Sequence, residues 1–240
     1  MYKKYLFSLL FIILVGCSKE PPIIIQEVTD PTSETSIDLV AEEFSDLESA
    51  QFLEFTLSDQ QISLNINKIP ILANFLENHN DRDRAIQNMQ LTQILKEKFD
   101  SIFLLSFACQ DNSCSYVLIN TESEYSKLLA DQARTVKINA SPDESYLLIQ
   151  FERQLRTNPW VTNKLFVLDL DTWEEVILTF DDKNMTSLHS FRWPILDAEW
   201  RNDDKLEITL PDLEIPSTST LANWSESEDK PEKTIITQIN

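Results

Sequence analysis

Glycine is almost absent from this chain: Gly16 is the only one among 240 residues. Loops that cradle a phosphate need glycine, because the backbone must approach the ligand closely and adopt positive φ. The sequence therefore excludes a glycine-rich phosphate loop, a dinucleotide-binding turn and a glycine-flanked serine elbow. Turns with positive φ must use Asn or Asp instead. The candidates are Asn78, Asn80, Asp111, Asn112, Asn202 and Asp203.

Positive charge is also scarce. Twenty Lys and Arg face 40 Asp and Glu, which gives a formal net charge of −20. A field of this sign repels nucleic acid, so we expect no nucleic-acid partner. The acids are spread through the whole chain, which favours solubility on an exposed surface over attraction of cations or of a basic partner. At 42% hydrophobic residues, the chain is nevertheless globular and not disordered.

Histidine is limited to His79 and His189, so a catalytic triad or a zinc site would have to use one of them alone. A surface or turn position is the favoured interpretation of both. Asp169, Asp171 and Glu174 line one turn and could bind calcium, but their spacing lacks the EF-hand pattern and its glycine. We therefore expect neither a metal nor a cofactor.

Residues 1–16 have the layout of an export signal. Lys3 and Lys4 precede the uncharged, mostly apolar residues 5–16, a run too short to cross about 30 Å of hydrocarbon as a helix. The run ends in Leu14-Val15-Gly16-Cys17, which resembles the lipobox of bacterial lipoproteins. The resemblance implies that Cys17 receives a diacylglyceryl group and that the signal peptide is cleaved before it. An ordinary cleaved signal that happens to hold a cysteine is the less favoured alternative.

The expected attachment to the membrane is lipid alone. Stable anchoring needs at least two acyl chains, such as palmitate, and a diacylglyceryl group on Cys17 meets that condition. No later stretch approaches eighteen apolar residues. We expect the protein on the extracytoplasmic face of the cell membrane. Because Ser18 and not aspartate follows the cysteine, the resemblance implies the outer membrane if the source is Gram-negative.

The chain after the signal divides by composition. Residues 17–48 contain nine acids and three prolines, which favours a flexible, extended tether. Residues 49–215 have the patterning of one β-rich globular domain. Residues 216–240 are polar and predict a C-terminal tail, in which residues 234–239 could add one edge strand.

A short helical region is expected near the start of the globular domain. Pro70 suits the first turn of a helix, and apolar residues follow it on one face. Asp81 or Asp83 could cap a second helix that runs to about Gln90. Residues 91–96 could continue that helix or form a strand, and we favour the strand.

The remaining apolar segments predict antiparallel strands. Residues 165–168 are apolar on both faces, which predicts a central strand covered on both sides. The two strands around Asn202-Asp203 alternate apolar and polar residues and should bury only one face. The expected strands are 52–56, 62–66, 102–107, 116–119, 146–151, 164–170, 196–201 and 206–210.

Two motifs resemble those of TolB-like and WD-type β-propeller repeats. Ser141-Pro142-Asp143-Glu144-Ser145-Tyr146-Leu147 resembles the S-P-D-G-x-x-L turn and strand. Residues 165–172, Leu-Phe-Val-Leu-Asp-Leu-Asp-Thr, resemble the following strand, usually V-x-D-L-x-T-G. Glu144 and Trp173 stand where the repeats have glycine. The chain is also similar to short bacterial lipoproteins with degenerate repeats of this kind, a resemblance that brings no known activity.

The resemblance implies blades but not a closed ring. Weaker echoes lie at residues 102–122 and 198–210, and the step from Ile102 to Tyr146 is about one blade period of 40–45 residues. The repeats span residues 101–214, roughly two and a half blades, whereas a ring needs at least four. We expect a mainly β, α+β fold: an antiparallel, blade-like meander with a small helical element.

Two cysteines remain once Cys17 is lipidated, and an exported compartment permits a disulfide. Cys109 and Cys114 flank Gln110-Asp111-Asn112-Ser113, in which Asp111-Asn112 tolerates the positive φ of a two-residue hairpin turn. The cysteines then form a non-hydrogen-bonded cross-strand pair with Cα atoms about 4.5 Å apart. That spacing predicts a disulfide. A redox or metal pair is the alternative.

The expected function is binding of a protein or cell-wall partner without catalysis. Trp160 follows Asn158-Pro159 in a loop and is the tryptophan most suited to an exposed partner contact. The alternative is an envelope glycan hydrolase that uses two carboxylates. Carboxylate pairs are frequent in so acidic a chain and identify no active site. These pairs include Asp181-Asp182, Asp203-Asp204 and Glu174-Glu175.

Overall fold

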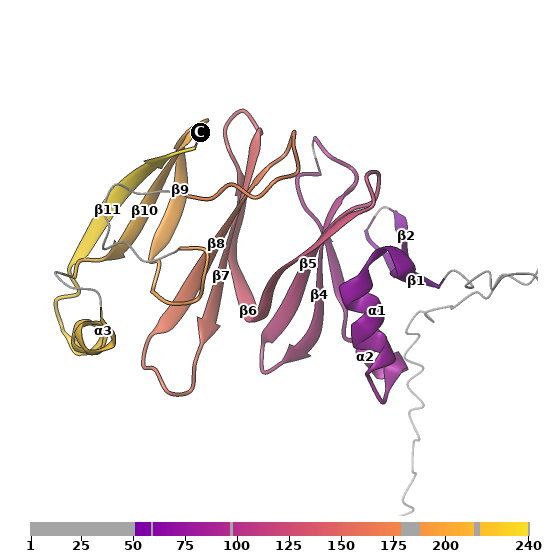
Figure 1. Cartoon of the computed structure of the whole chain (residues 1–240), viewed down its shortest axis with the longest axis horizontal. Coiled ribbons are helices and arrows are strands. Elements are labelled where there is room, and N and C mark those ends of the chain that lie inside the picture. The colour runs from indigo at the N-terminus through magenta and orange to yellow at the C-terminus, as the bar shows by residue number, and fades with distance from the viewer. Residues whose placement is uncertain (1–50, 59, 97, 179–187, 214–216, 240) are drawn as a thin grey trace, which may run out of the picture.

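The computed structural model describes residues 51–239 apart from 59, 97, 179–187 and 214–216. The described part is mainly antiparallel β-structure with a few short helices, as expected (Figure 1). No sheet within it closes into a ring. The predicted signal peptide and the predicted tether lie outside the described residues.

The described part of the chain begins with a small cap beside the main sheet (Figure 1). Pro70 starts the first helix as predicted, and the Asp81 carboxylate caps the second by accepting a hydrogen bond from the Arg84 N–H at 3.1 Å. Leu72 and Leu76 are buried, so the side of the first helix that carries them faces the core. The elements of the cap are β1 (Phe52–Thr56), β2 (Gln61–Asn65), a 3-10 turn (Ile66–Lys68), α1 (Pro70–Glu77) and α2 (Arg82–Gln87).

A six-stranded antiparallel meander follows, with its strands in chain order. Residues 91–96 begin as a strand, as favoured above. The long β6 was not predicted: its first half pairs with β5 and its second half pairs with β7. It therefore links two blade-like units. The first unit is β3, β4, β5 and the first half of β6, and the second is the second half of β6 with β7 and β8. The strands are β3 (Gln90–Gln93), β4 (Ile102–Gln110), β5 (Ser113–Asn120), β6 (Tyr125–Ala140), β7 (Tyr146–Gln154) and β8 (Val161–Asp169).

Strand β8 confirms the expected burial on both faces. Residues 165–168 have no exposed surface. Phe166 and Leu168 pack in a cluster with the first unit, and Leu165 and Val167 pack in a cluster with the C-terminal sheet. The strand is nevertheless last in the hydrogen-bonding order. Its outer edge pairs with a short segment in which Glu175 bridges Leu168 and the Val176 N–H donates to the Val167 carbonyl at 2.9 Å. This segment gives the second unit a fourth extended chain.

The C-terminal residues correct the domain boundary. They form a helix and a strand and not a polar tail, because Leu221 and Trp224 are buried on one side of the helix and the last strand pairs with its neighbour. The expected edge strand at 234–239 is confirmed within this region. The elements of the third unit are β9 (Asp197–Asn202), β10 (Lys205–Pro211), α3 (Thr218–Glu226) and β11 (Glu232–Gln238).

Three successive layers of apolar side chains hold the units together. The first joins the cap to one face of β4 and β5, the second joins the first two units, and the third joins β7 and β8 to the C-terminal sheet. The cap thus covers one end of an open row of sheets (Figure 1). At the other end, Glu199, Glu207 and Thr234 lie on the outward face of the three-stranded sheet. The outward face of this sheet is therefore mostly polar, with Ile236 as an exposed apolar residue on it.

Most turns with positive φ do not use Asn or Asp, contrary to the expectation from composition. Asp111 and Asn112 do adopt it, with φ of 48° and 65°. The other candidates named above do not appear among the residues with positive φ. Packing and turn hydrogen bonds impose this geometry on other residue types, which are Leu95, Ala108, Glu124, Gln132, Glu144 and Trp173.

Candidate functional site

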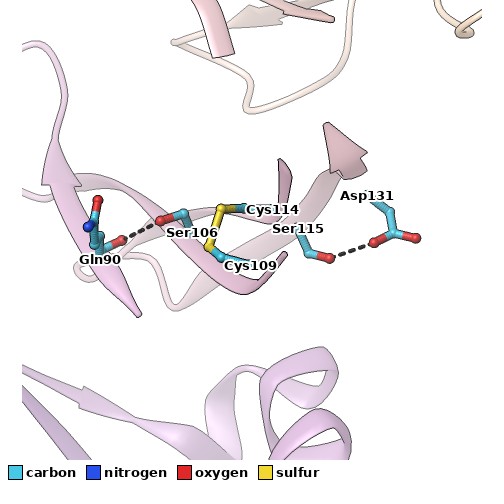
Figure 2. Close-up of a disulfide and its surroundings, with 6 residues drawn as sticks. All are labelled: Gln90, Ser106, Cys109, Cys114, Ser115 and Asp131. Carbon is cyan, nitrogen blue, oxygen red and sulfur yellow. Dashed lines mark hydrogen bonds between the residues drawn. A yellow bond between two sulfur atoms is a disulfide. The ribbon is translucent and has the colours of Figure 1, made fainter. Parts of the chain in front are cut away.

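The predicted disulfide of the cysteine hairpin is confirmed, but the regular cross-strand pairing expected for the two cysteines is not. Cys109 and Cys114 are joined by a disulfide (Figure 2), with Cα atoms 4.0 Å apart. Gln110 pairs with Ser113 beside the turn. A bulge at Ala108, where φ is 52°, places two residues of β4 opposite one residue of β5. The bridge therefore pins the end of a hairpin whose ladder is already irregular.

Trp160 is not the exposed contact that the sequence suggested. Only 8% of its surface is exposed, and it packs with Leu221 and Trp224 of α3. The prediction was wrong because the chain after residue 216 was expected to be a tail, and the helix that covers Trp160 was missed. Trp160 thus holds α3 against the start of β8.

The acidic turns are used within the fold. An Asp169 carboxylate oxygen accepts the N–H groups of Asp171 and Thr172, each at 2.9 Å. Asp143 accepts hydrogen bonds from the hydroxyls of Ser141 and Ser145, each at 2.7 Å, which lower its pKa to about 2. The propeller-like S-P-D motif thus makes the turn between β6 and β7. Within the described residues, no three His, Cys, Asp or Glu side chains gather to hold a metal.

His189 is half-buried between units, and His79 is exposed. The His189 Nε2 accepts the Leu178 N–H at 2.9 Å, so its proton resides on Nδ1, 3.8 Å from the Glu175 carboxylate. Burial lowers the pKa of His189. Because the basic nitrogen already accepts a backbone hydrogen bond, this histidine ties two loops together and is not free to abstract a proton.

A concave pocket lies between the cap and the first unit. Its cavity volume is about 130 Å³, below the ~300–1,000 Å³ of pockets that enclose a whole drug-sized ligand, so it has room for a single side chain. Apolar side chains from β1, β2, the residue before α1 and β5 make much of its lining, with Tyr125 from β6 at one side. The lining residues are Phe52, Ser63, Leu64, Asn65, Lys68, Ile69, Ile119, Thr121, Glu124 and Tyr125.

The rim of this pocket carries one ion pair. Lys68 Nζ and a Glu124 carboxylate oxygen are 2.8 Å apart, and both side chains are more than half exposed. Salt and water therefore weaken the pair, and a ligand with its own charge can compete for either group. Glu124 has φ of 53°, which turns the chain into β6 at the pocket edge.

Tyr125 connects the pocket to the seam between the first two units. Its ring lies 5.4 Å from the Trp173 ring. Burial raises the pKa of Tyr125, with Lys127 opposing and Glu175 reinforcing the shift. Lys127 in turn pairs with Glu175 at 2.6 Å, so the neutral phenol lies beside a fixed pair of charges. This side of the pocket can offer a hydrogen bond at the end of an apolar surface.

Sequence reasoning missed this pocket because its walls come from segments that are distant in the chain. Phe52 lies in a strand that the sequence predicted, and Tyr125 lies in β6, which it did not predict. The sequence does not reveal that these two strands border one pocket. The nearest signal was the alternation of apolar residues in 62–66, which marks one buried face but not what covers it. Neither Trp160 nor the carboxylate pairs named above line the pocket.

No family model, curated protein or solved structure matches this chain. Among the described residues, no helix is long and apolar enough to span a membrane.

Proposed function

We propose that this chain is a lipid-anchored protein of the cell envelope that binds a protein or cell-wall partner and catalyses no reaction. The observation that carries the proposal is the segment Leu14-Val15-Gly16-Cys17 after a basic start and an uncharged apolar run. Such a segment is typical of a lipoprotein signal, with Cys17 as the acylated residue. The lipid holds the protein on the extracytoplasmic face of the membrane.

Two further features support an exported protein with a binding role. The Cys109–Cys114 bridge suits an oxidising compartment. The acidic, proline-containing stretch between Cys17 and the first strand has the composition of an extended linker, which lets a domain reach a partner beyond the bilayer.

The pocket beside Lys68 and Glu124 is the proposed contact point. An apolar side chain of the partner fills the space over Leu64 and Ile119, and a polar group at its end meets Tyr125 or the rim pair. Anchors of this kind, a buried apolar group within a polar rim, provide most of the affinity in many interfaces.

The test is capture of partners from crosslinked envelopes with matched pocket variants. Ser63 lines the pocket on β2, whereas Gln61 lies two residues earlier on the same strand and does not line it. Ser63→Trp fills the pocket and should lose the partner, while Gln61→Trp should retain it, with both variants still in the membrane fraction.

Two results count against this proposal in different ways. Equal capture by both tryptophan variants removes the pocket from the interface and leaves the binding role standing. Recovery of no partner by the wild type, together with hydrolysis of a cell-wall glycan, defeats the binding role and favours the hydrolase.

A further inference from the structure

In the described part of the chain, the third blade-like unit has one extended segment fewer than the second. The second unit has four extended segments, from the second half of β6 to the segment at Glu175. Among the residues that the structure describes, the third unit has three strands, β9, β10 and β11, with β11 at its edge. Within the described residues nothing pairs with the outer side of β11, which lies at the end of the row of sheets (Figure 1).

The backbone groups that β11 leaves outward follow from its pairing with β10. At the two ends of this ladder, the Ile239 N–H donates to the Asp204 carbonyl and the Asp212 N–H donates to the Pro231 carbonyl, each at 2.8 Å. In an antiparallel pair, alternate residues bond to the same neighbour. The residues that direct N–H and carbonyl groups away from β10 are therefore Glu232, Thr234, Ile236 and Gln238.

We propose that β11 pairs antiparallel with β11 of a second copy of this chain, which joins two three-stranded sheets into one. The outward residues fix the register. Ile235 lies on the two-fold axis opposite Ile235 of the second copy, and Thr234 lies opposite Ile236. Every outward N–H and carbonyl from Glu232 to Gln238 then finds a partner on the other strand.

The side chains suit this self-pairing. Ile235 meets its own copy in a non-hydrogen-bonded pair, the closest cross-strand position. On the outward face Ile236, which is 51% exposed, lies diagonal to its copy. Lys233 falls opposite Thr237 and Glu232 falls opposite Gln238, so no like charges face each other across the strands.

The net charge of the chain opposes the dimer, and it makes the affinity of the dimer depend on ionic strength. Two chains of net charge −20 repel one another at long range, and salt screens that repulsion. Unlike an interface held by ion pairs, this one should become tighter as ionic strength rises.

Cysteine crosslinking of the full chain in its membrane tests the register. Ile235→Cys places two thiols on the axis with Cα atoms about 4.5 Å apart, within disulfide range. Lys233→Cys lies on the same strand and face, but its copy is four residues away across the axis, out of reach. A disulfide-linked dimer with Ile235→Cys and none with Lys233→Cys is the expected result. No dimer with Ile235→Cys, equal dimer with both, or a crosslink to another protein overturns the proposal.

A second pair of variants tests the edge without crosslinking. Ile236→Lys puts two positive charges diagonal to each other at the interface, whereas Thr209→Lys adds the same charge to the same face of the middle strand. Light scattering of the detergent-solubilised full chain should show about a twofold lower protein mass for Ile236→Lys only. A monomeric wild type at all ionic strengths, or a dimer that Ile236→Lys leaves intact, overturns the proposal.

Discussion

Single residues in this chain adopt backbone geometry that glycine usually provides. Glu144 and Trp173 have φ of 58° and 60°, at the two positions where the propeller-like motifs carry glycine. The left-handed region costs a non-glycine residue about 1–2 kcal/mol. At Glu144 the hydrogen bond from its N–H to the Ser141 carbonyl holds the turn, and at Trp173 the ring packs against Tyr125.

The first prediction is that glycine substitution changes the free energy of unfolding in opposite directions at these two positions. Glu144→Gly should raise the free energy of unfolding by about 0.5–1 kcal/mol, because relief of the left-handed strain exceeds the added entropy of the unfolded chain. The lost ion pair with Lys98 is exposed and contributes little. Trp173→Gly relieves the same strain but removes the contact with Tyr125 and should lower stability. Urea unfolding of both variants measures the difference, and equal signs for the two changes would refute this explanation.

The second prediction concerns pH. The pKa of His189 is lowered in the folded state, so the unfolded chain binds a proton first as the pH falls. The contribution of His189 to stability is present above its unfolded pKa of about 6.5 and is lost as the pH falls below it. His189→Gln keeps an acceptor for the Leu178 N–H and should lose less stability between about pH 7 and pH 5. His79→Gln, at an exposed site, should behave as the wild type in the same melts.

At the scale of elements, the disulfide hairpin is the feature that local sequence predicted most fully. The turn at Asp111-Asn112, the pair Gln110 with Ser113 and the bridge itself all follow from six consecutive residues. The third prediction is that reduction, or the double change Cys109→Ala with Cys114→Ala, costs about 2 kcal/mol, since the closed loop is short. Denaturant unfolding measures the loss. Two free thiols in the exported, non-reduced protein would contradict the bridge.

The elements that could not be predicted from the sequence, β6 and α3, are those that depend on partners distant in the chain. In β6, the register shifts opposite residues 114–117 of β5 and again at residues 135–137 of β6 itself. These shifts break the alternation of apolar and polar residues, so no single pattern marks its sixteen residues as a strand. In α3, most side chains are small and polar, and only Leu221 and Trp224 are buried. Local patterning cannot predict either element, because distant parts of the chain cover them.

The fourth prediction follows from the corrected position of Trp160. Trp160→Ala should cost about 3–5 kcal/mol, because it empties the space between β8 and α3. Trp160→Phe should cost less, since it keeps an aromatic ring and removes a buried indole N–H that has no partner in the structure. Thermal melts of the two variants give the comparison. A Trp160→Ala variant as stable as the wild type would mean that α3 does not depend on this contact.

At the scale of the whole molecule, the units form an open row. The structure at one end of this row differs from the structure at the other end. The helical cap covers the first unit, and it also makes the pocket that we propose as the partner contact. The third unit ends in a mostly polar face and in β11, whose outer edge pairs with none of the described residues. The motif resemblance and the length of the repeat region predicted a blade-like meander too short for a ring, but only the structure shows which end the helical cap covers.

The most direct test of the proposed function is metabolic labelling with radioactive palmitate. The wild type should incorporate the label and remain with the membrane, and Cys17→Ala should be unlabelled and either unprocessed or shed, because its acylated thiol is gone. The double variant Cys109→Ala with Cys114→Ala is the matched control and should be labelled as the wild type. Equal labelling of the wild type and of Cys17→Ala would contradict the lipid anchor.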